Sequence, residues 1–267
     1  MQREGPEAGL LAGDEPAPVE FVNSHGTAPV VLVCDHASRF IPRALDSLGL
    51  DEIELARHIA WDIGAAEVTR HLARLLDAPA VISHFSRLVV DPNRKPDSTA
   101  SIPEESDGIA VPGNKRLLSA DRTARLDSFF HPYQNAIADT LAERRKTCGM
   151  NPVLLSIHSF TPVMEGVERP WKLGILWSYD PRLAQPLIDR LRAAGITVGD
   201  NEPYSGREGF GYTTEVHGDA QGVANALIEI RQDLIDTHHG AREWAGLLGR
   251  VLKEALKSPE LYKELER

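Results

Sequence analysis

Two histidines stand at the ends of apolar runs that have the length and composition of buried strands. His36 follows VVLVC (residues 30–34), and His158 follows PVLLSI (residues 152–157). In open α/β sheets, ligands bind outside the carboxyl ends of the strands, so neighbouring strands would bring both imidazoles to one edge. Two imidazoles and a carboxylate are the usual protein ligands of a catalytic zinc, which keeps its fourth position open for water. The sequence therefore predicts a metal site at this edge.

Two aspartates are candidates for the carboxylate ligand. Asp62, in HIAWDIGA, is the first candidate, although an aspartate in this position also suits a helix N-cap. Asp35 is the nearer alternative, either as a ligand itself or as a hydrogen-bond partner that orients a ligating histidine. A metal held by such groups lowers the pKa of its bound water to about 7, which makes hydroxide available at neutral pH.

A third group of polar residues flanks a short predicted strand in SRLVVDPNR, which contains Arg87, Asn93 and Arg94. A guanidinium binds a carboxylate through two parallel hydrogen bonds, and an arginine beside a polarised carbonyl stabilises an oxyanion. The alternative for either arginine is a structural ion pair with one of the many acidic residues.

Glu229 lies inside the apolar run LIEI, where a carboxylate is costly to bury unless it is paired or functional. At the metal-binding edge it would act as general base for water and as acid for a leaving amine. Arg231, two residues later, would face the same side of a strand, so simple neutralisation of Glu229 is the alternative.

Other catalytic mechanisms find less support. Cys34 and His36 share a face of an extended chain, so a thiol nucleophile is one alternative. The chain lacks the G-x-S-x-G, G-x-x-x-x-G-K-[ST] and H-E-x-x-H motifs, and GREGFG does not have dinucleotide-binding spacing. The two cysteines, Cys34 and Cys148, are far apart in sequence, which favours a reducing cytoplasm over a disulfide framework.

The elements that must position these groups alternate between apolar runs and amphipathic stretches. This alternation predicts a three-layer α/β fold, with a mainly parallel mixed sheet and helices on both faces. We expect a flexible leader over residues 1–20 and a single domain over 21–267. The loop at 92–115, with four prolines, is expected to be functional, for example as a lid. Strands are expected at 30–34, 78–91, 152–160, 172–179, 196–199 and 226–235, and helices at 51–78, with a break near Gly64, and at 119–146, 181–195 and 240–257.

Bulk properties limit the partners of the 267-residue chain. Its net charge of −10 argues against a sequence-independent nucleic-acid binder, which needs a basic face. No apolar run approaches 18 residues, and the N-terminus lacks the pattern of a signal peptide. We therefore expect a cytoplasmic protein that binds a small molecule, with neither nucleic acid nor membrane as a partner. A homo-oligomer stays open.

Five motifs, taken in order, resemble those of the N-formylglutamate amidohydrolases, also called N-formylglutamate deformylases. They span residues 34–235, and this family is similar in fold to zinc carboxypeptidases, which have the phosphorylase/hydrolase-like fold, and to aspartoacylase-type deacylases. The motifs are CDHASRFIP (34–42), HIAWDIGA (58–65), SRLVVDPNR (86–94), SIHSF (156–160) and IEIRQDLI (228–235).

The resemblance implies that His36 and His158 are zinc ligands. Zinc carboxypeptidases take their second ligand from H-x-x-E, whereas here the third residue after His36 is Arg39. The carboxylate must therefore come from elsewhere, with Asp62 as the candidate. His217, in TTEVHG, either lines the substrate pocket or replaces Asp62 as a ligand.

The resemblance also implies roles in hydrolysis. Arg87 corresponds to the oxyanion-stabilising arginine, Asn93 and Arg94 to the pair that grips the substrate carboxylate, and Glu229 to the catalytic glutamate. The implied reaction converts N-formyl-L-glutamate to L-glutamate and formate, at the end of one route of histidine degradation. The alternatives are another N-acyl amino acid, a carboxypeptidase-like peptidase, and a non-catalytic binding protein on the same scaffold.

The sequence offers no obvious site for a second anionic group of the substrate. Arg169, Lys172 and Arg207 are the cations that predicted loops make available for one.

Overall fold

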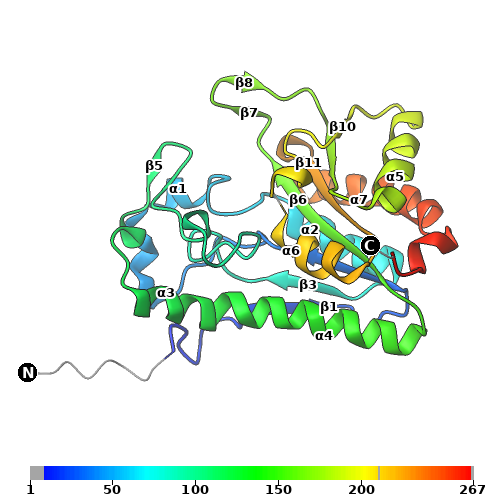
Figure 1. The fold of residues 1–267 in the computed structure, drawn as a ribbon. Coiled ribbons are helices and arrows are strands. Elements are labelled where there is room, and N and C mark those ends of the chain that lie inside the picture. Colours follow the sequence, from blue (N-terminus) through cyan, green and yellow to red (C-terminus); the bar gives the residue numbers. More distant parts are fainter. Residues whose placement is uncertain (1–8, 210, 266–267) are drawn as a thin grey trace, which may run out of the picture.

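The computed structural model describes residues 9–209 and 211–265 and has a seven-stranded sheet at its centre (Figure 1). The strand order is β1-β3-β2-β6-β11-β9-β10. The pairs β3–β2, β2–β6, β6–β11 and β9–β10 are parallel, whereas β1–β3 and β11–β9 are antiparallel. The strands are β1 (Val19–Val22), β2 (Val30–Cys34), β3 (Ala80–Ser83), β6 (Val153–Phe160), β9 (Leu173–Leu176), β10 (Val198–Asp200) and β11 (Asn225–Arg231).

Helices cover both faces of this sheet, which confirms the predicted three-layer α/β fold. Alternate residues of β2 face opposite layers, as expected for a strand. Val30 and Leu32 pack in the core beneath α2 (Ala65–Leu76), α5 (Pro181–Ala193) and α7 (His238–Ala255). Val31 and Val33 pack in the second core against α4 (His131–Cys148), which runs along the other face in Figure 1. Because both faces are covered, β2 is apolar throughout.

Shorter elements complete the fold around the carboxyl end of β6. Two small hairpins, β4–β5 and β7–β8, lie beside the central sheet. The remaining elements are α1 (Glu52–Leu55), β4 (Glu105–Ser106), β5 (Ile109–Ala110), α3 (Ser119–Arg125), β7 (Val163–Met164), β8 (Val167–Glu168) and α6 (Tyr212–His217).

The predicted helix over 51–78 is present only in part: α1 is a single turn, the chain forms turns over 56–64, and α2 begins after Gly64. Asp51 caps the first of these, α1, in a reciprocal capping box with Glu54. The prediction of a strand across SRLVVD is wrong, because after β3 the chain forms turns. The Ser86 hydroxyl donates to the Ala60 carbonyl and accepts from the Leu88 amide, which stabilises the turn locally.

The helix expected from Ser119 consists of α3 and α4, joined by a π-helical turn over Leu126–Phe130. This turn ends two residues before Pro132, which has no N–H for the regular helical hydrogen bond. The predicted strand ends are otherwise close to the observed ones, although His158 lies inside β6 rather than after it.

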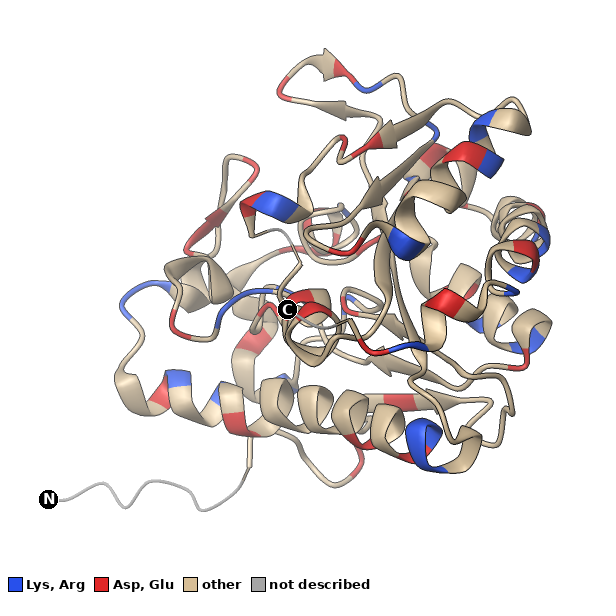
Figure 2. Cartoon of the chain, turned by 45° about the vertical axis from the view of Figure 1, so that its right-hand side comes forward, with Lys and Arg blue, Asp and Glu red and all other residues tan. Residues whose placement is uncertain are grey.

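The predicted leader falls partly on residues 1–8, which lie outside the described residues. Within the described part, Glu15 accepts a hydrogen bond from the Arg43 amide at 2.8 Å, and β1 begins at Val19. No helix among the described residues has both the length and the apolar character needed to span a membrane. Basic and acidic residues are interspersed over the helices and loops (Figure 2).

The proline-rich loop between β3 and α3 is tethered by two arginines of α3. Arg122 donates to the Ser98 carbonyl at 2.8 Å. Arg125, which is buried, donates to Asn114 Oδ1 at 2.6 Å and to the Val89 carbonyl at 3.0 Å. These bonds hold the loop against the turns that follow β3.

Gly64 should be irreplaceable where the chain enters α2. Its φ of +81° is left-handed, and a Cβ would lie 2.1 Å from the Ile235 carbonyl oxygen. At Gly149, φ is +68° and a Cβ would meet nothing within 4 Å. We expect Gly149→Ala to lower the free energy of unfolding by about 1 kcal/mol. Gly64→Ala should lower it by a further ~1–3 kcal/mol because of the backbone clash.

Urea denaturation of the two variants measures this difference. Equal losses of unfolding free energy would show that the close approach of Ile235 to Gly64 has no energetic consequence.

Candidate active site

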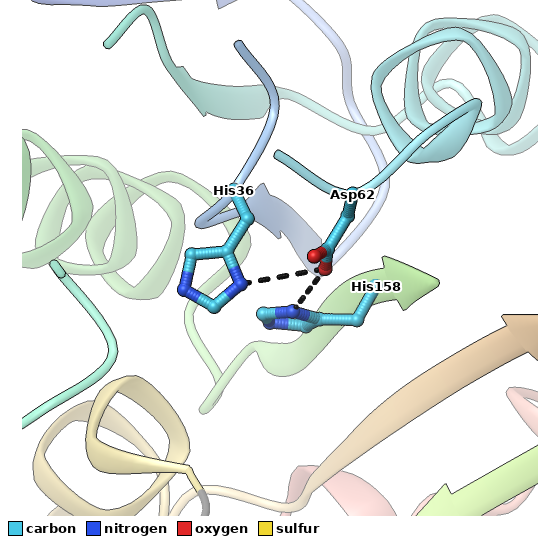
Figure 3. A group of neighbouring side chains, drawn as sticks. All are labelled: His36, Asp62 and His158. Atoms are coloured by element: carbon cyan, nitrogen blue, oxygen red, sulfur yellow. Dashed lines mark hydrogen bonds and ion pairs between the residues drawn. The ribbon is translucent and has the colours of Figure 1, made fainter. Parts of the chain in front are cut away.

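His36, Asp62 and His158 converge from three different elements (Figure 3). His36 lies in the turn after β2, Asp62 in the turn before α2, and His158 in β6. One ligand atom from each lies within 4.8 Å of the others, and all three residues are buried. Asp62 Oδ2 is 2.8 Å from His158 Nδ1 and 3.4 Å from His36 Nδ1. The structure thus brings together the three residues predicted to hold a metal.

The backbone around Asp62 explains its orientation. Its amide donates to the His36 carbonyl at 2.8 Å, which ties the two turns together. The N-cap of α2 is Gly64, and no side chain caps this helix. Asp62 is therefore not the helix cap that its sequence position also suited, and its carboxylate faces the imidazoles instead.

The outer nitrogen of each imidazole is bound to a further aspartate. His36 Nε2 lies 2.7 Å from Asp91 Oδ1, and His158 Nε2 lies 2.7 Å from Asp35 Oδ2. Since an ionised carboxylate only accepts hydrogen bonds, both Nε2 atoms carry the proton. The Nδ1 atoms are then left to face Asp62. His36 Nδ1 is buried and has no hydrogen-bond partner in the described part of the chain.

Asp35 orients His158 and is itself held by several donors. Burial alone would raise its pKa, but His158 and other donors keep the pKa below its usual range. The hydroxyl donors are Ser156 at 2.9 Å, Thr213 at 2.7 Å and Tyr133 at 3.0 Å. This is the orienting role considered for Asp35, although its partner is His158 rather than the adjacent His36.

His158 lies between two carboxylates. Burial disfavours its charged form, but hydrogen bonds to Asp35 and Asp62 outweigh this and raise its pKa to about 10. Burial also opposes the charged form of Asp62, yet His36 and His158 hold its pKa below the usual value. The site therefore favours positive charge between Asp62 and the two Nδ1 atoms. Together with the partnerless His36 Nδ1, these donors fit a metal ion.

Arg87 and Asp91 form the next layer of the site. Arg87 Nη2 lies 2.8 Å from Asp91 Oδ2, and its Nη1 lies 3.6 Å from Asp62 Oδ1. Asp91 Oδ1 also accepts from the Asn93 amide at 2.8 Å, and Asn93 Oδ1 accepts from the Thr213 amide at 3.0 Å. These bonds fix the positions of the Arg87 guanidinium and the Asn93 side chain.

Glu229 lies beside His158 because the two residues are paired in the parallel register of β11 and β6. Its Oε2 atom is buried and has no hydrogen-bond partner among the described residues. Burial raises the pKa of Glu229 to about 7, although the positive charge of His158 opposes this. Arg231, the alternative partner, bonds instead to Asp233 at 2.7 Å.

The predicted metal-binding group, Arg87 and Glu229 line a cavity of about 230 Å³. Of the predicted site residues, His217 is not part of the lining: its Nε2 lies 2.7 Å from Gln134 Oε1. Cys34 is also absent from the lining, and burial raises the pKa of its thiol well above the usual value. The lining residues are His36, His58, Ile59, Asp62, Arg87, Asn93, Arg94, Ser106, Asp107, His158, Ser159, Phe160, Thr161, Met164, Leu176, Tyr204, Leu227, Glu229 and Gln232.

Sequence reasoning missed several residues of this site. Asp91 is the most important, since it binds both His36 and Arg87. A carboxylate directly after the apolar run LVV was a signal for it, of the kind that identified Glu229. Thr213, in helix α6, and Tyr204, in a loop, carry no comparable signal, because they are distant in sequence and reach the site only through the tertiary fold.

Two solved structures are similar to this chain over most of its length. A gene product of Agrobacterium tumefaciens is 37% identical, with a TM-score of 0.90 over 94% of this chain and 99% of that chain. The N-formylglutamate amidohydrolase of Ralstonia eutropha is 20% identical, with a TM-score of 0.65 over 90% of this chain and 96% of that chain. No curated protein sequence matches the chain significantly. The model of the N-formylglutamate amidohydrolase family matches residues 28–236, and the chain therefore belongs to this family.

Proposed function

We propose that this chain is a zinc-dependent hydrolase of the amide bond in N-acyl amino acids. N-Formyl-L-glutamate is the reference substrate, because it is the substrate named by the family and by the Ralstonia protein. One observation carries the proposal: the buried group His36, Asp62 and His158 shares a cavity with Glu229, whose Oε2 has no partner among the described atoms.

Two imidazoles and one carboxylate match the ligand set of catalytic zinc. Asp91 and Asp35 hold the Nε2 protons of His36 and His158, so each ring would bind a cation through Nδ1, with His158 first losing the proton that it shares with Asp62. A zinc ion bound there would supply Lewis acidity, which polarises an acyl carbonyl and lowers the pKa of water.

Glu229 moves the proton in this proposal. Its carboxylate accepts a proton from the attacking water and returns it to the nitrogen of the leaving amine. A pKa raised to about 7 by burial suits both transfers, because the group gains and loses a proton near neutral pH. Arg87 donates hydrogen bonds to the oxyanion that develops on the acyl oxygen.

Asn93 and Arg94 bind the substrate carboxylate in this scheme. Both line the cavity, and the Asn93 Oδ1 bond to the Thr213 amide leaves the Nδ2 group of Asn93 as the donor. His217, expected to bind substrate, acts here through a neighbour: it bonds to Gln134, which donates to the Pro92 carbonyl just before Asn93.

Removal of a ligand should remove the metal. We expect purified wild-type protein to contain about one zinc per chain, and His36→Ala and His158→Ala to contain much less, because each loses one of three protein ligands. His217→Ala is the matched control, since this buried histidine lies outside the group. Metal content is measured by elemental analysis. Stoichiometric zinc in both ligand variants would contradict the proposed site.

Metal affinity should depend on pH in a defined direction. His158, with a pKa raised to about 10, holds a proton at neutral pH that a metal must displace. The association constant should therefore rise about tenfold per pH unit between pH 6 and 9, with about one proton released per ion. Calorimetric titration in buffers of different ionisation enthalpy counts this proton. An affinity that stays constant over this range would refute displacement from His158.

Glu229→Gln should separate proton transfer from metal binding. The amide keeps the size of the side chain but cannot accept the proton, so kcat should fall by about 10²–10⁴ while the zinc content is unchanged. Glu168→Gln, on the exposed strand β8, serves as the control and should keep full activity. Activity is measured as formate release from a panel of N-formyl-L-amino acids that includes N-formyl-L-glutamate. Retained turnover in Glu229→Gln would remove it as the base.

A further inference from the structure

The catalytic cavity has a limited supply of positive charge. Among the described residues that line it, Arg87 and Arg94 are the arginines, and there is no lysine. Arg87 already lies against two carboxylates, at 2.8 Å from Asp91 and 3.6 Å from Asp62. Arg94 is the other arginine of the lining and is the one assigned to the carboxylate subsite, so the cavity provides for one substrate carboxylate.

The three loop cations expected to be available for a second anion do not line this cavity. Arg169 donates to the Tyr204 hydroxyl at 3.0 Å and stacks on the same ring at 4.8 Å, whereas Tyr204 itself faces the cavity. Arg207 stacks on Trp177 at 4.5 Å beside a different hollow. Lys172 is exposed.

One wall of the cavity is apolar. It is formed by Phe160 at the end of β6, Leu176 at the end of β9, Leu227 on β11, and Met164 on the β7–β8 hairpin. A carboxylate placed against these side chains would lose its hydration and gain no donor, which is strongly unfavourable. An uncharged group placed there buries apolar surface instead.

The other described side chains of the lining add no permanent cation. Ser106, Ser159, Thr161, Tyr204 and Gln232 are uncharged, and Glu229 is a carboxylate. Asp107, at the β4–β5 hairpin, lies 2.7 Å from Arg57 and 3.5 Å from His58, so both are already opposed by a carboxylate. Burial also lowers the pKa of His58, which keeps it neutral at neutral pH. A second substrate carboxylate would therefore lose its hydration with only uncharged groups to replace it.

From these walls we infer that the enzyme selects N-acyl amino acids that carry a single carboxylate and an uncharged side chain, and disfavours the dicarboxylate N-formyl-L-glutamate. This inference rests on the proposed hydrolase function and specifies its substrate class. The carboxylate lies at Asn93 and Arg94, and the side chain lies against the apolar wall of Phe160, Met164, Leu176 and Leu227.

The decisive comparison uses N-formyl-L-glutamine and N-formyl-L-glutamate, which match in size and differ in one charge. At pH 8 we expect kcat/KM to be at least about tenfold higher for the glutamine compound, with N-formyl-L-leucine also above the glutamate compound. This ratio should shrink as the pH approaches the side-chain carboxyl pKa of about 4.3, because the glutamate side chain then loses its charge. Ionisations of the enzyme affect both substrates alike and cancel in the ratio.

The outcomes test the substrate class separately from the hydrolase function. An equal or higher kcat/KM for N-formyl-L-glutamate would overturn the substrate class and leave the hydrolase function intact. Hydrolysis of none of the three compounds, by protein that contains zinc, would overturn the proposed function and the inference with it.

A reciprocal variant tests the location of the side chain. Met164 is half-buried on a surface hairpin, so a longer polar side chain fits there without disturbing the central sheet. Met164→Lys should shift the preference towards N-formyl-L-glutamate by at least about tenfold relative to Met164→Gln, which has the same polarity change without charge. An unchanged ratio between these two variants would overturn the assignment of the apolar wall to the side chain.

Discussion

The site depends on the burial of three carboxylates, Asp35, Asp62 and Asp91, around two imidazoles. Buried carboxylates are tolerated only when paired and hydrogen-bonded, because desolvation costs several kcal/mol for each ion. Arg87 contacts two of these carboxylates, Asp62 and Asp91. His158 contacts Asp35 and Asp62, and its raised pKa shows that this pair of carboxylates favours a positive charge between them. A metal ion held by the Nδ1 atoms and Asp62 would take the place of that proton and supply the positive charge.

The sheet explains how such a group is assembled. The registers of β2, β6 and β11 place Val33 beside Ser156 and Glu229 beside His158. The chain therefore delivers Asp35, His158 and Glu229 to one edge of three adjacent parallel strands. Asp62 comes from the turn before helix α2. The left-handed conformation of Gly64, where the chain enters α2, directs this turn so that Asp62 faces the imidazoles. The chemistry lies where strand ends and a helix start meet.

Much of this could be predicted from sequence, for physical reasons that differ among residues. Fully buried strands have continuous apolar runs, so VVLVC and PVLLSI identified β2 and β6, and the polar residues at their ends identified His36 and His158. Glu229 was detectable because a carboxylate is rare inside such a run. Asp62 was ambiguous, because a short-range pattern cannot distinguish a helix cap from a ligand.

What the sequence did not reveal depends on non-local geometry. The turn at Ser86 replaced a predicted strand because its hydroxyl bonds to Ala60, far back along the chain. His217 was expected near the substrate, but its contact with Gln134 depends on how α6 and α4 approach each other. Local periodicity contains no information about such contacts, so the residues that support the site are harder to predict than those at strand ends.

The groups proposed to act on the amide bond and those proposed to contact the rest of the substrate come partly from different parts of the fold, which affects how substrate choice can vary. The groups proposed to act on the amide bond come from strands and adjoining turns that the core fixes rigidly. The walls that would contact the rest of the substrate come from both the sheet and the hairpins: Phe160, Leu176 and Leu227 lie on strands of the sheet, whereas Asp107 and Met164 lie on the β4–β5 and β7–β8 hairpins. Loops tolerate substitution far better than core strands do, and binding residues concentrate on them. Membership of the family therefore constrains the amide chemistry more tightly than the charge of the side chain, since the proposed substrate walls include hairpin residues such as Met164 and Asp107.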